Sequence, residues 1–84
     1  MNKEQILTTL KSYIADEILE GDAADLEAST PLLDLGVLNS LEVARMMGFI
    51  QRSFGFSVPL ASIRVENLRT LSALTEMVFG LQRE

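Results

Sequence analysis

The chain has 84 residues, with 7 Lys and Arg against 12 Asp and Glu, a net charge of −5, and it contains no Cys and no His. Without cysteine it cannot form a disulfide, a zinc ribbon or a thiol nucleophile. Without histidine it has neither an imidazole base nor a Ser-His-Asp triad.

With 48% hydrophobic and 23% charged residues, the composition is that of a globular chain, and residues 1–84 are expected to form a single domain. The acidic excess argues against binding to nucleic acids or anionic membranes. No apolar run approaches the roughly 18 residues of a spanning helix. Because the polar segment Met1–Glu4 does not resemble a signal peptide, a cytoplasmic location is expected.

A first amphipathic helix is predicted from about residue 3 to about residue 19. Apolar residues recur there at spacings of three and four, which is the period of a helix with one buried face. They are Ile6, Leu7, Leu10, Tyr13, Ile14 and Ile18. Asn2 is placed to cap the start, and Gly21 with Asp22 is expected to break the helix.

Residues 21–38 are predicted to form a long connection, because they show no sustained period and Pro31 opposes a continuous helix. The segment is unusually apolar for a loop, with Leu26, Leu32, Leu33, Leu35 and Leu38. Loops of this length usually pack through their own side chains or carry function. We therefore expect these leucines to anchor the loop over the helices.

A second helix is predicted to begin within residues 36–40, Gly-Val-Leu-Asn-Ser. Asn39 is a strong N-cap residue, which makes Ser40 the first helical residue. The helix should continue to about Phe54 and end at Gly55.

The remainder of the chain predicts two more helical segments. Pro59 begins a second connection, and a short helical turn is expected around residues 65–68. Thr70 can cap a last helix whose apolar residues are Leu71, Leu74, Val78 and Leu81. Since no strand pattern competes, the predicted fold is all-α: a small four-helix bundle with three main helices, one short helix and a long first loop.

The second helix has two predicted faces. Val43, Met46, Met47, Ile50 and Phe54 share one side and are interpreted as core packing. Leu41, Ala44 and Gly48 lie on the other side, with Arg45, Gln51 and Arg52 beside them. A glycine inside a helix costs roughly 1 kcal/mol relative to alanine, so close approach of a partner to Gly48 is one interpretation. The other is that Gly48 is simply tolerated and Leu41 is a lone exposed leucine.

Ser40 is the most informative polar residue. It would lie at the positive end of the second helix, a favourable place for a phosphate. No His or Cys is available to activate its hydroxyl, so it is not expected to act as a catalyst, although another enzyme could modify it. The simpler interpretation is an ordinary serine at a helix start. No catalytic residues and no metal site are predicted, because the acidic residues lack the spacing of an EF-hand loop.

Residues 30–43, Thr-Pro-Leu-Leu-Asp-Leu-Gly-Val-Leu-Asn-Ser-Leu-Glu-Val, resemble the modification site of acyl and peptidyl carrier proteins. Those families carry a Leu-Gly-x-x-Asp-Ser-Leu segment before their second helix. Residues 54–59 are similar to their second loop, and residues 66–71 to the beginning of their last helix. The resemblance covers essentially the whole chain.

The resemblance implies that Ser40 carries a covalent 4′-phosphopantetheine arm from coenzyme A, whose sulfur holds an acyl or aminoacyl group as a thioester. The implied partners are a phosphopantetheinyl transferase, an acyl- or aminoacyl-loading enzyme and downstream synthase enzymes. Carriers of this kind are typically monomeric. The expected partner surface consists of Asn39, Leu41, Glu42, Ala44, Arg45, Gly48, Gln51 and Arg52.

Two features depart from the family pattern. Asn39 stands where the family usually has Asp, which removes a negative charge that a transferase would meet. Carriers of the fatty-acid type have a very acidic second helix that meets basic patches, whereas here Glu42 is accompanied by Arg45 and Arg52. Because charge pairing mainly sets partner choice and association rate, the chain resembles a discrete carrier for a dedicated polyketide, nonribosomal-peptide or similar pathway.

An alternative hypothesis remains open because of Asn39. The chain could be an unmodified carrier-like adaptor that binds a partner protein through the second helix. Refusal of the arm from several transferases, together with tight binding of an unmodified partner, would favour it.

Overall fold

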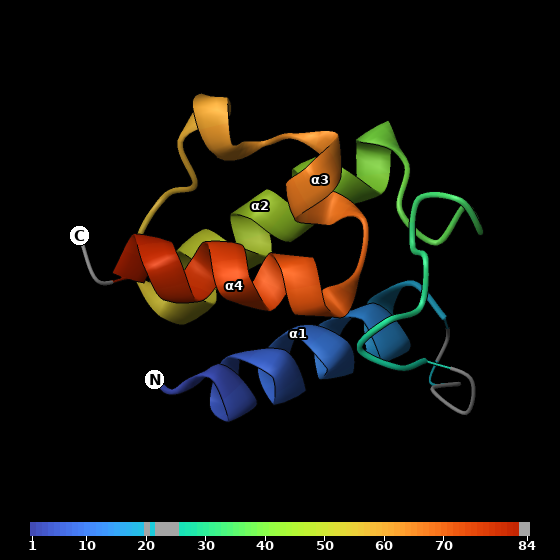
Figure 1. The fold of residues 1–84 in the computed structure, drawn as a ribbon, viewed down its shortest axis with the longest axis horizontal. Helices are drawn as coiled ribbons and strands as arrows, with labels where there is room; N and C mark the ends of the chain where they lie inside the picture. Colours follow the sequence, from blue (N-terminus) through green and yellow to red (C-terminus); the bar gives the residue numbers. More distant parts are fainter. Residues whose placement is uncertain (20, 22–25, 83–84) are drawn as a thin grey trace.

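The computed structural model describes residues 1–19, 21 and 26–82. The elements are α1 (Lys3–Glu17), α2 (Ser40–Phe54), the 3₁₀ turn η1 (Leu60–Ser62), α3 (Val65–Leu68) and α4 (Leu71–Gln82) (Figure 1). This arrangement confirms the predicted all-α fold with three main helices and one short helix. Among the described residues, none of the helices has the length and apolarity needed to cross a membrane.

α1 begins with the predicted cap at Asn2. The Asn2 Oδ1 atom accepts from the Gln5 amide at 2.8 Å, and Gln5 Oε1 accepts from the Asn2 amide at 2.9 Å. This reciprocal pair satisfies two amides that a helix start otherwise leaves unpaired. The helix ends at Glu17, slightly before the predicted boundary near residue 19. Gly21 follows with φ +88°, whereas Asp22, also part of the predicted break, lies outside the described residues.

Three of the five loop leucines are anchors, as predicted. Leu26, Leu32 and Leu38 are buried, and Leu33 is half-buried against the core. The prediction is wrong for Leu35, which is 64% exposed. The chain turns tightly there, with the Leu35 amide bonded to the Pro31 carbonyl at 3.0 Å, and this turn leaves the Leu35 side chain facing solvent.

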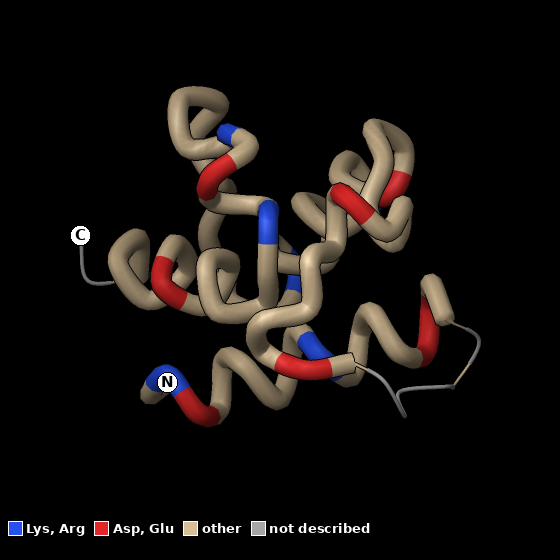
Figure 2. The backbone as a smooth tube through the Cα atoms, turned by 45° about the vertical axis from the view of Figure 1, so that its right-hand side comes forward, with Lys and Arg blue, Asp and Glu red and all other residues tan. Residues whose placement is uncertain are grey.

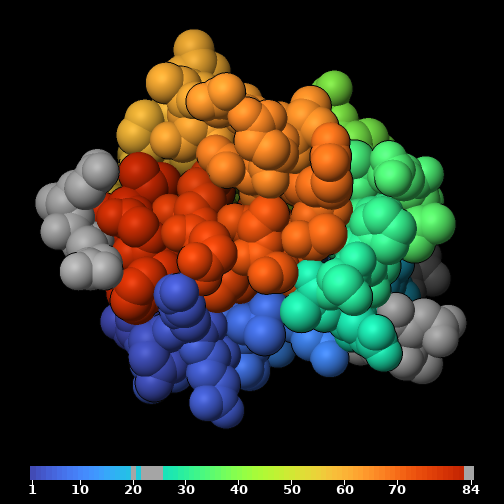
Figure 3. Space-filling view, viewed as in Figure 1, coloured from blue at the N-terminus to red at the C-terminus, as the bar shows by residue number. Residues whose placement is uncertain are grey.

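The first loop is also tied to the C-terminal half by backbone hydrogen bonds. The Leu32 amide donates to the Arg69 carbonyl at 2.8 Å, and the Ser72 amide donates to the Ala28 carbonyl at 3.0 Å. In the space-filling view, the loop beyond residue 26 lies directly against the start of α4 and against α1 (Figure 3). The loop that leads to α2 is therefore held against the rest of the molecule both by its buried leucine side chains and by backbone hydrogen bonds.

The core lies between the three long helices, with α4 packed against both α1 and α3 (Figure 1). Its most fully buried side chains are Ile6, Leu10, Ile14, Leu32, Met46, Ile50, Leu71, Leu74 and Val78. Burying a side chain of this size contributes about 1.5–3 kcal/mol. These residues therefore supply most of the favourable free energy of folding.

α2 contributes Met46 and Ile50 to the buried core, as its predicted inner face requires. Val43, Met47 and Phe54 are only half-buried. A further contact was not predicted: the Phe49 ring stacks on Tyr13 of α1, with the ring centroids 4.2 Å apart. Stacked aromatic pairs contribute about 0.5–1.5 kcal/mol beyond their buried area, so this pair fastens α2 to α1.

The C-terminal half follows the predicted order with one addition. Thr70 Oγ1 accepts from the Ala73 amide at 3.0 Å, which confirms the predicted cap of α4. Pro59 precedes η1, a turn that the sequence analysis described only as a connection. The Asn67 side chain donates to the Ser62 carbonyl at 2.8 Å and so ties η1 to α3.

We predict that Ile50→Ala destabilises the protein by about 2–5 kcal/mol, because it removes a fully buried side chain and leaves a cavity. Urea denaturation followed by circular dichroism measures the change. Gln51→Ala is the matched control, since Gln51 is the next residue of α2 and is exposed. A loss below 1 kcal/mol for Ile50→Ala would contradict the assignment of the inner face.

Candidate functional site

The candidate site is the beginning of α2, where Asn39 caps the helix and Ser40 is its first residue. Asn39 has an extended backbone (φ −129°, ψ −177°), and its Oδ1 atom accepts from the Glu42 amide at 2.9 Å. Both features are those of an N-cap residue. The predicted cap and the predicted helix start are therefore confirmed.

Ser40 is exposed to solvent, so its hydroxyl is within reach of an external enzyme. The first amides of a helix point out of its end and give that end a partial positive charge. A phosphate diester on the Ser40 oxygen would lie beside these amides. The exposed hydroxyl and the positive helix end thus fit a phosphate-linked group.

The residues predicted to form the partner surface lie mainly on the outside of α2. Asn39, Leu41, Ala44, Arg45, Gln51 and Arg52 are exposed, whereas Glu42 and Gly48 are half-buried. Leu41 is 68% exposed one residue after Ser40. The structure thus brings an exposed apolar side chain next to the candidate hydroxyl.

The packing around Gly48 does not require a glycine. A Cβ atom added there would lie 3.2 Å from Arg52 Nη1, the far end of a flexible side chain that can move away. The interpretation of Gly48 as a site of close approach by a partner therefore has no support from contacts within the chain, and it stays a prediction.

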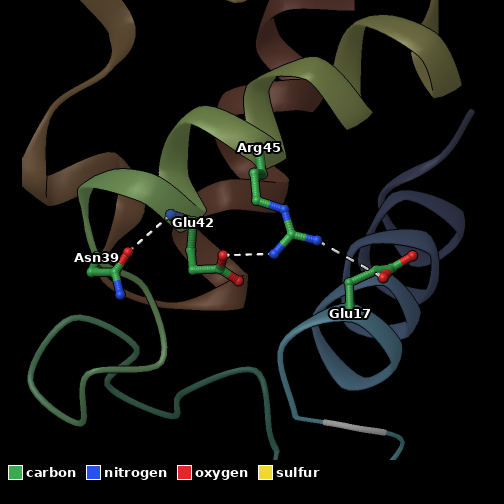
Figure 4. Close-up of polar contacts among 4 residues, drawn as sticks. All are labelled: Glu17, Asn39, Glu42 and Arg45. Carbon is green, nitrogen blue, oxygen red and sulfur yellow. Dashed lines mark hydrogen bonds and ion pairs between the residues drawn. The ribbon is translucent and has the colours of Figure 1, made fainter.

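Arg45 takes part in an ionic network that the sequence analysis did not identify (Figure 4). Its Nη1 atom lies 2.8 Å from Glu42 Oε1, and its Nη2 atom lies 4.0 Å from Glu17 Oε2 on α1. The spacing of three between Glu42 and Arg45 is a pairing signal on a helix, but the partner on α1 becomes apparent only from the fold.

The pKa values of Arg45 and of the nearby Tyr13 are both raised. The hydrogen bond to Glu42, followed by the charge of that carboxylate, raises the pKa of Arg45, so the guanidinium stays charged. Burial raises the pKa of the nearby Tyr13 phenol, which therefore stays neutral at physiological pH.

Acidic and basic positions are both spread over the described part of the backbone (Figure 2). Within the described residues, no three acidic side chains gather closely enough to hold a metal ion.

The geometry is that of a helix start with an exposed hydroxyl, and the sequence profile of the phosphopantetheine attachment site family matches residues 8–78. The chain belongs to this family. It is a carrier protein, and its cofactor is a covalently attached 4′-phosphopantetheine. That group supplies a thiol, on which an acyl intermediate is held as a thioester.

Two curated relatives are carrier proteins. The probable acyl carrier protein PigG of Serratia sp. (strain ATCC 39006) is 25% identical over 73 residues, covering 87% of this chain and 84% of that protein. Aminoacyl carrier protein 1 of Bradyrhizobium diazoefficiens is 28% identical over 76 residues, covering 90% of this chain and 80% of that protein.

Solved structures share the fold. A chain in the crystal structure of an FAD-dependent dehydrogenase matches with a TM-score of 0.75 and 32% identity, covering 81% of this chain and 96% of that one. A chain in the complex of Bradyrhizobium japonicum glycine:carrier protein ligase with glycylated carrier protein matches with a TM-score of 0.64 and 25% identity. This second match covers 89% of this chain and 96% of that one.

We predict that Asn39→Ala destabilises the protein by about 0.5–2 kcal/mol, because the Glu42 amide loses its cap. Asn39→Asp should retain stability, since aspartate caps equally well and its charge is favourable at a helix N-terminus. Urea denaturation of both variants measures the difference. Equal destabilisation by the two substitutions would show that the Asn39 cap is not what stabilises the start of α2.

Proposed function

We propose that Ser40 is the residue to which the 4′-phosphopantetheine arm is attached. The observation that carries this proposal is the position of Ser40: it is exposed, it is the first residue of α2, and it lies within residues 8–78 of the family match. Its neighbours also agree with the modification-site pattern, with Leu35 and Gly36 before it and Leu41 after it.

Attachment would be a transfer of the phosphopantetheinyl group by a separate transferase, in which a phosphoanhydride bond breaks and a phosphodiester bond forms. The Ser40 oxygen attacks the β-phosphorus of coenzyme A, the bond to the leaving phosphate breaks, and adenosine 3′,5′-bisphosphate departs. The hydroxyl proton passes to a base of the transferase, because the chain has no histidine or cysteine to accept it. This chain supplies an accessible oxygen and the dipole of α2, which favours the new anionic diester.

The cargo proposed for this carrier is an acyl or aminoacyl group in a dedicated secondary pathway. Both curated relatives are carriers, one acyl and one aminoacyl. A ligase that activates and loads an amino acid is the proposed loading partner, since a similar chain occurs in a complex of a glycine ligase with its glycylated carrier. An FAD-dependent dehydrogenase is a candidate downstream partner, because a similar chain occurs in a crystal structure of such an enzyme.

In this proposal the chemistry belongs to the partner enzymes, and the carrier presents the tethered cargo to each of them. Because coenzyme A is the donor of the arm, we place the modification in the cytoplasm. The carrier would act as a monomer, with one face of α2 meeting each partner in turn.

We predict that the wild type gains the mass of the arm when incubated with coenzyme A and a broad-specificity phosphopantetheinyl transferase, and that Ser40→Ala abolishes the gain. Ser53→Ala is the matched control, because Ser53 is also an exposed serine of α2. Intact-mass spectrometry measures attachment, and circular dichroism checks that helicity is unchanged. Uptake of the arm by Ser40→Ala would refute the site, and refusal of the arm by the wild type with several transferases would favour an unmodified adaptor.

A second prediction concerns the exposed leucine beside the site. Leu41→Ala should lower kcat/KM for arm transfer about tenfold, roughly 1.4 kcal/mol, if the transferase buries this side chain. Its effect on unfolding should stay within about 0.5 kcal/mol, because Leu41 is a surface residue. Leu60→Ala is the control: Leu60 is 86% exposed, and it lies on η1, away from the start of α2 (Figure 1). Equal kinetic losses for the two variants would contradict a role specific to Leu41.

A further inference from the structure

Glu42 is an acidic residue in the first turn of α2, two residues after Ser40, yet its side chain is only 12% exposed. Arg45 pairs with it: the guanidinium donates to Glu42 Oε1 at 2.8 Å, and the Arg45 side chain is 47% exposed. The Arg45 guanidinium lies between the carboxylates of Glu42 and Glu17, so the Glu42 carboxylate at the start of α2 is already paired within the chain (Figure 4).

A second contact holds Arg45 in this position. Its other terminal nitrogen lies 4.0 Å from Glu17, at the end of α1. The guanidinium is a planar fork and can face two carboxylates at once. The Tyr13–Phe49 stack lies between the same two helices, so the helices that carry the two carboxylates are fixed relative to each other.

The charges closest to Ser40 on α2 then cancel. Between Asn39 and Arg45 the only charged residues are Glu42 and Arg45, and they are paired with each other. Asn39 caps the helix without adding a charge. At physiological ionic strength, exposed charges act over about 8 Å, so the paired residues Glu42 and Arg45 together contribute little net charge to this end of α2.

We propose that Arg45 is a specificity-determining residue that withholds the Glu42 carboxylate from partner enzymes. Resting on the proposed attachment at Ser40, this arrangement disfavours enzymes whose docking surface is basic, because the acid they would pair with is already occupied. Such enzymes would also meet the positive charge of Arg45. Specificity of this kind arises from a repulsive element as much as from an attractive one.

The contact between Arg45 and Glu17 has no large role in stability. Both Arg45 and Glu17 are substantially exposed, and ion pairs between exposed side chains contribute little to folding. Substitution of Arg45 should therefore change recognition while the helical bundle remains folded, which makes the proposal accessible to kinetics.

The test measures kcat/KM for arm transfer over a range of NaCl concentrations, using a fatty-acid-type phosphopantetheinyl transferase with a basic docking surface. Arg45→Gln exposes the Glu42 charge and should raise kcat/KM about 3- to 10-fold at low salt through electrostatic steering. The gain should disappear by about 0.5 M NaCl, where screening is strong. Glu17→Gln removes a negative charge and leaves Arg45 paired with Glu42, so it should give no gain.

Two further variants assign the effect to Glu42. In the double variant Glu42→Gln/Arg45→Gln, the low-salt gain should be lost, because no carboxylate is left to expose. Lys11→Gln is the matched control for charge: it also removes one positive charge, and Lys11 lies roughly 120° around the axis of α1 from Glu17. Its salt profile should follow that of the wild type.

Superimposable salt profiles for Arg45→Gln and the wild type would overturn the proposal, as would an equal gain for Lys11→Gln. Persistence of the gain in the double variant would also overturn it. Failure of the wild type to accept the arm at Ser40 would instead refute the proposed function, so the two failures are distinguishable. Arg45→Lys provides a rescue test, because it keeps the positive charge but not the planar guanidinium. Its kcat/KM at low salt should lie between the values of the wild type and of Arg45→Gln.

Discussion

The hydrogen bond from the Glu42 amide to the Asn39 side chain determines where α2 begins, and the geometry of the site follows from that starting point. A helix repeats every 3.6 residues, so the spacing between two residues sets the angle between their side chains around its axis. With Ser40 as the first residue, Leu41 lies roughly 180° around the axis from Ile50. The same helix can therefore bury Ile50 completely while it exposes Leu41 and Ser40.

The first loop supports this arrangement from outside α2. Its buried leucines and its hydrogen bonds to Arg69 and Ser72 hold the approach to Asn39 against α1, α3 and α4. The Tyr13–Phe49 stack and the ionic network of Arg45 add contacts between α1 and α2. Stability thus comes from the interior and the loop, and the outer face of α2 stays exposed to solvent.

Local signals were sufficient to predict much of the fold and the start of the site. The caps at Asn2, Asn39 and Thr70 each act on an amide three residues later, and Gly55 ends α2 with a left-handed backbone, φ +82°. Such interactions depend on residues that are close in sequence. The long-range contacts were not predicted, because they join residues that are far apart in the sequence. Phe49 needs Tyr13, and Arg45 needs Glu17, both on a helix more than 25 residues away. The outward direction of Leu35 likewise depends on a loop conformation that no periodicity encodes.

The start of α1 and the end of α4 meet at the side of the molecule opposite the start of α2 (Figure 1). The Met1 amino group lies 3.4 Å from Gln82 Oε1, and the Gln82 side-chain nitrogen donates in return to the Met1 carbonyl. A linker attached near either of these residues would leave the protein on the side away from Ser40. The protein could therefore be immobilised on a solid support or fused to another chain there, while Ser40 remained exposed to solution.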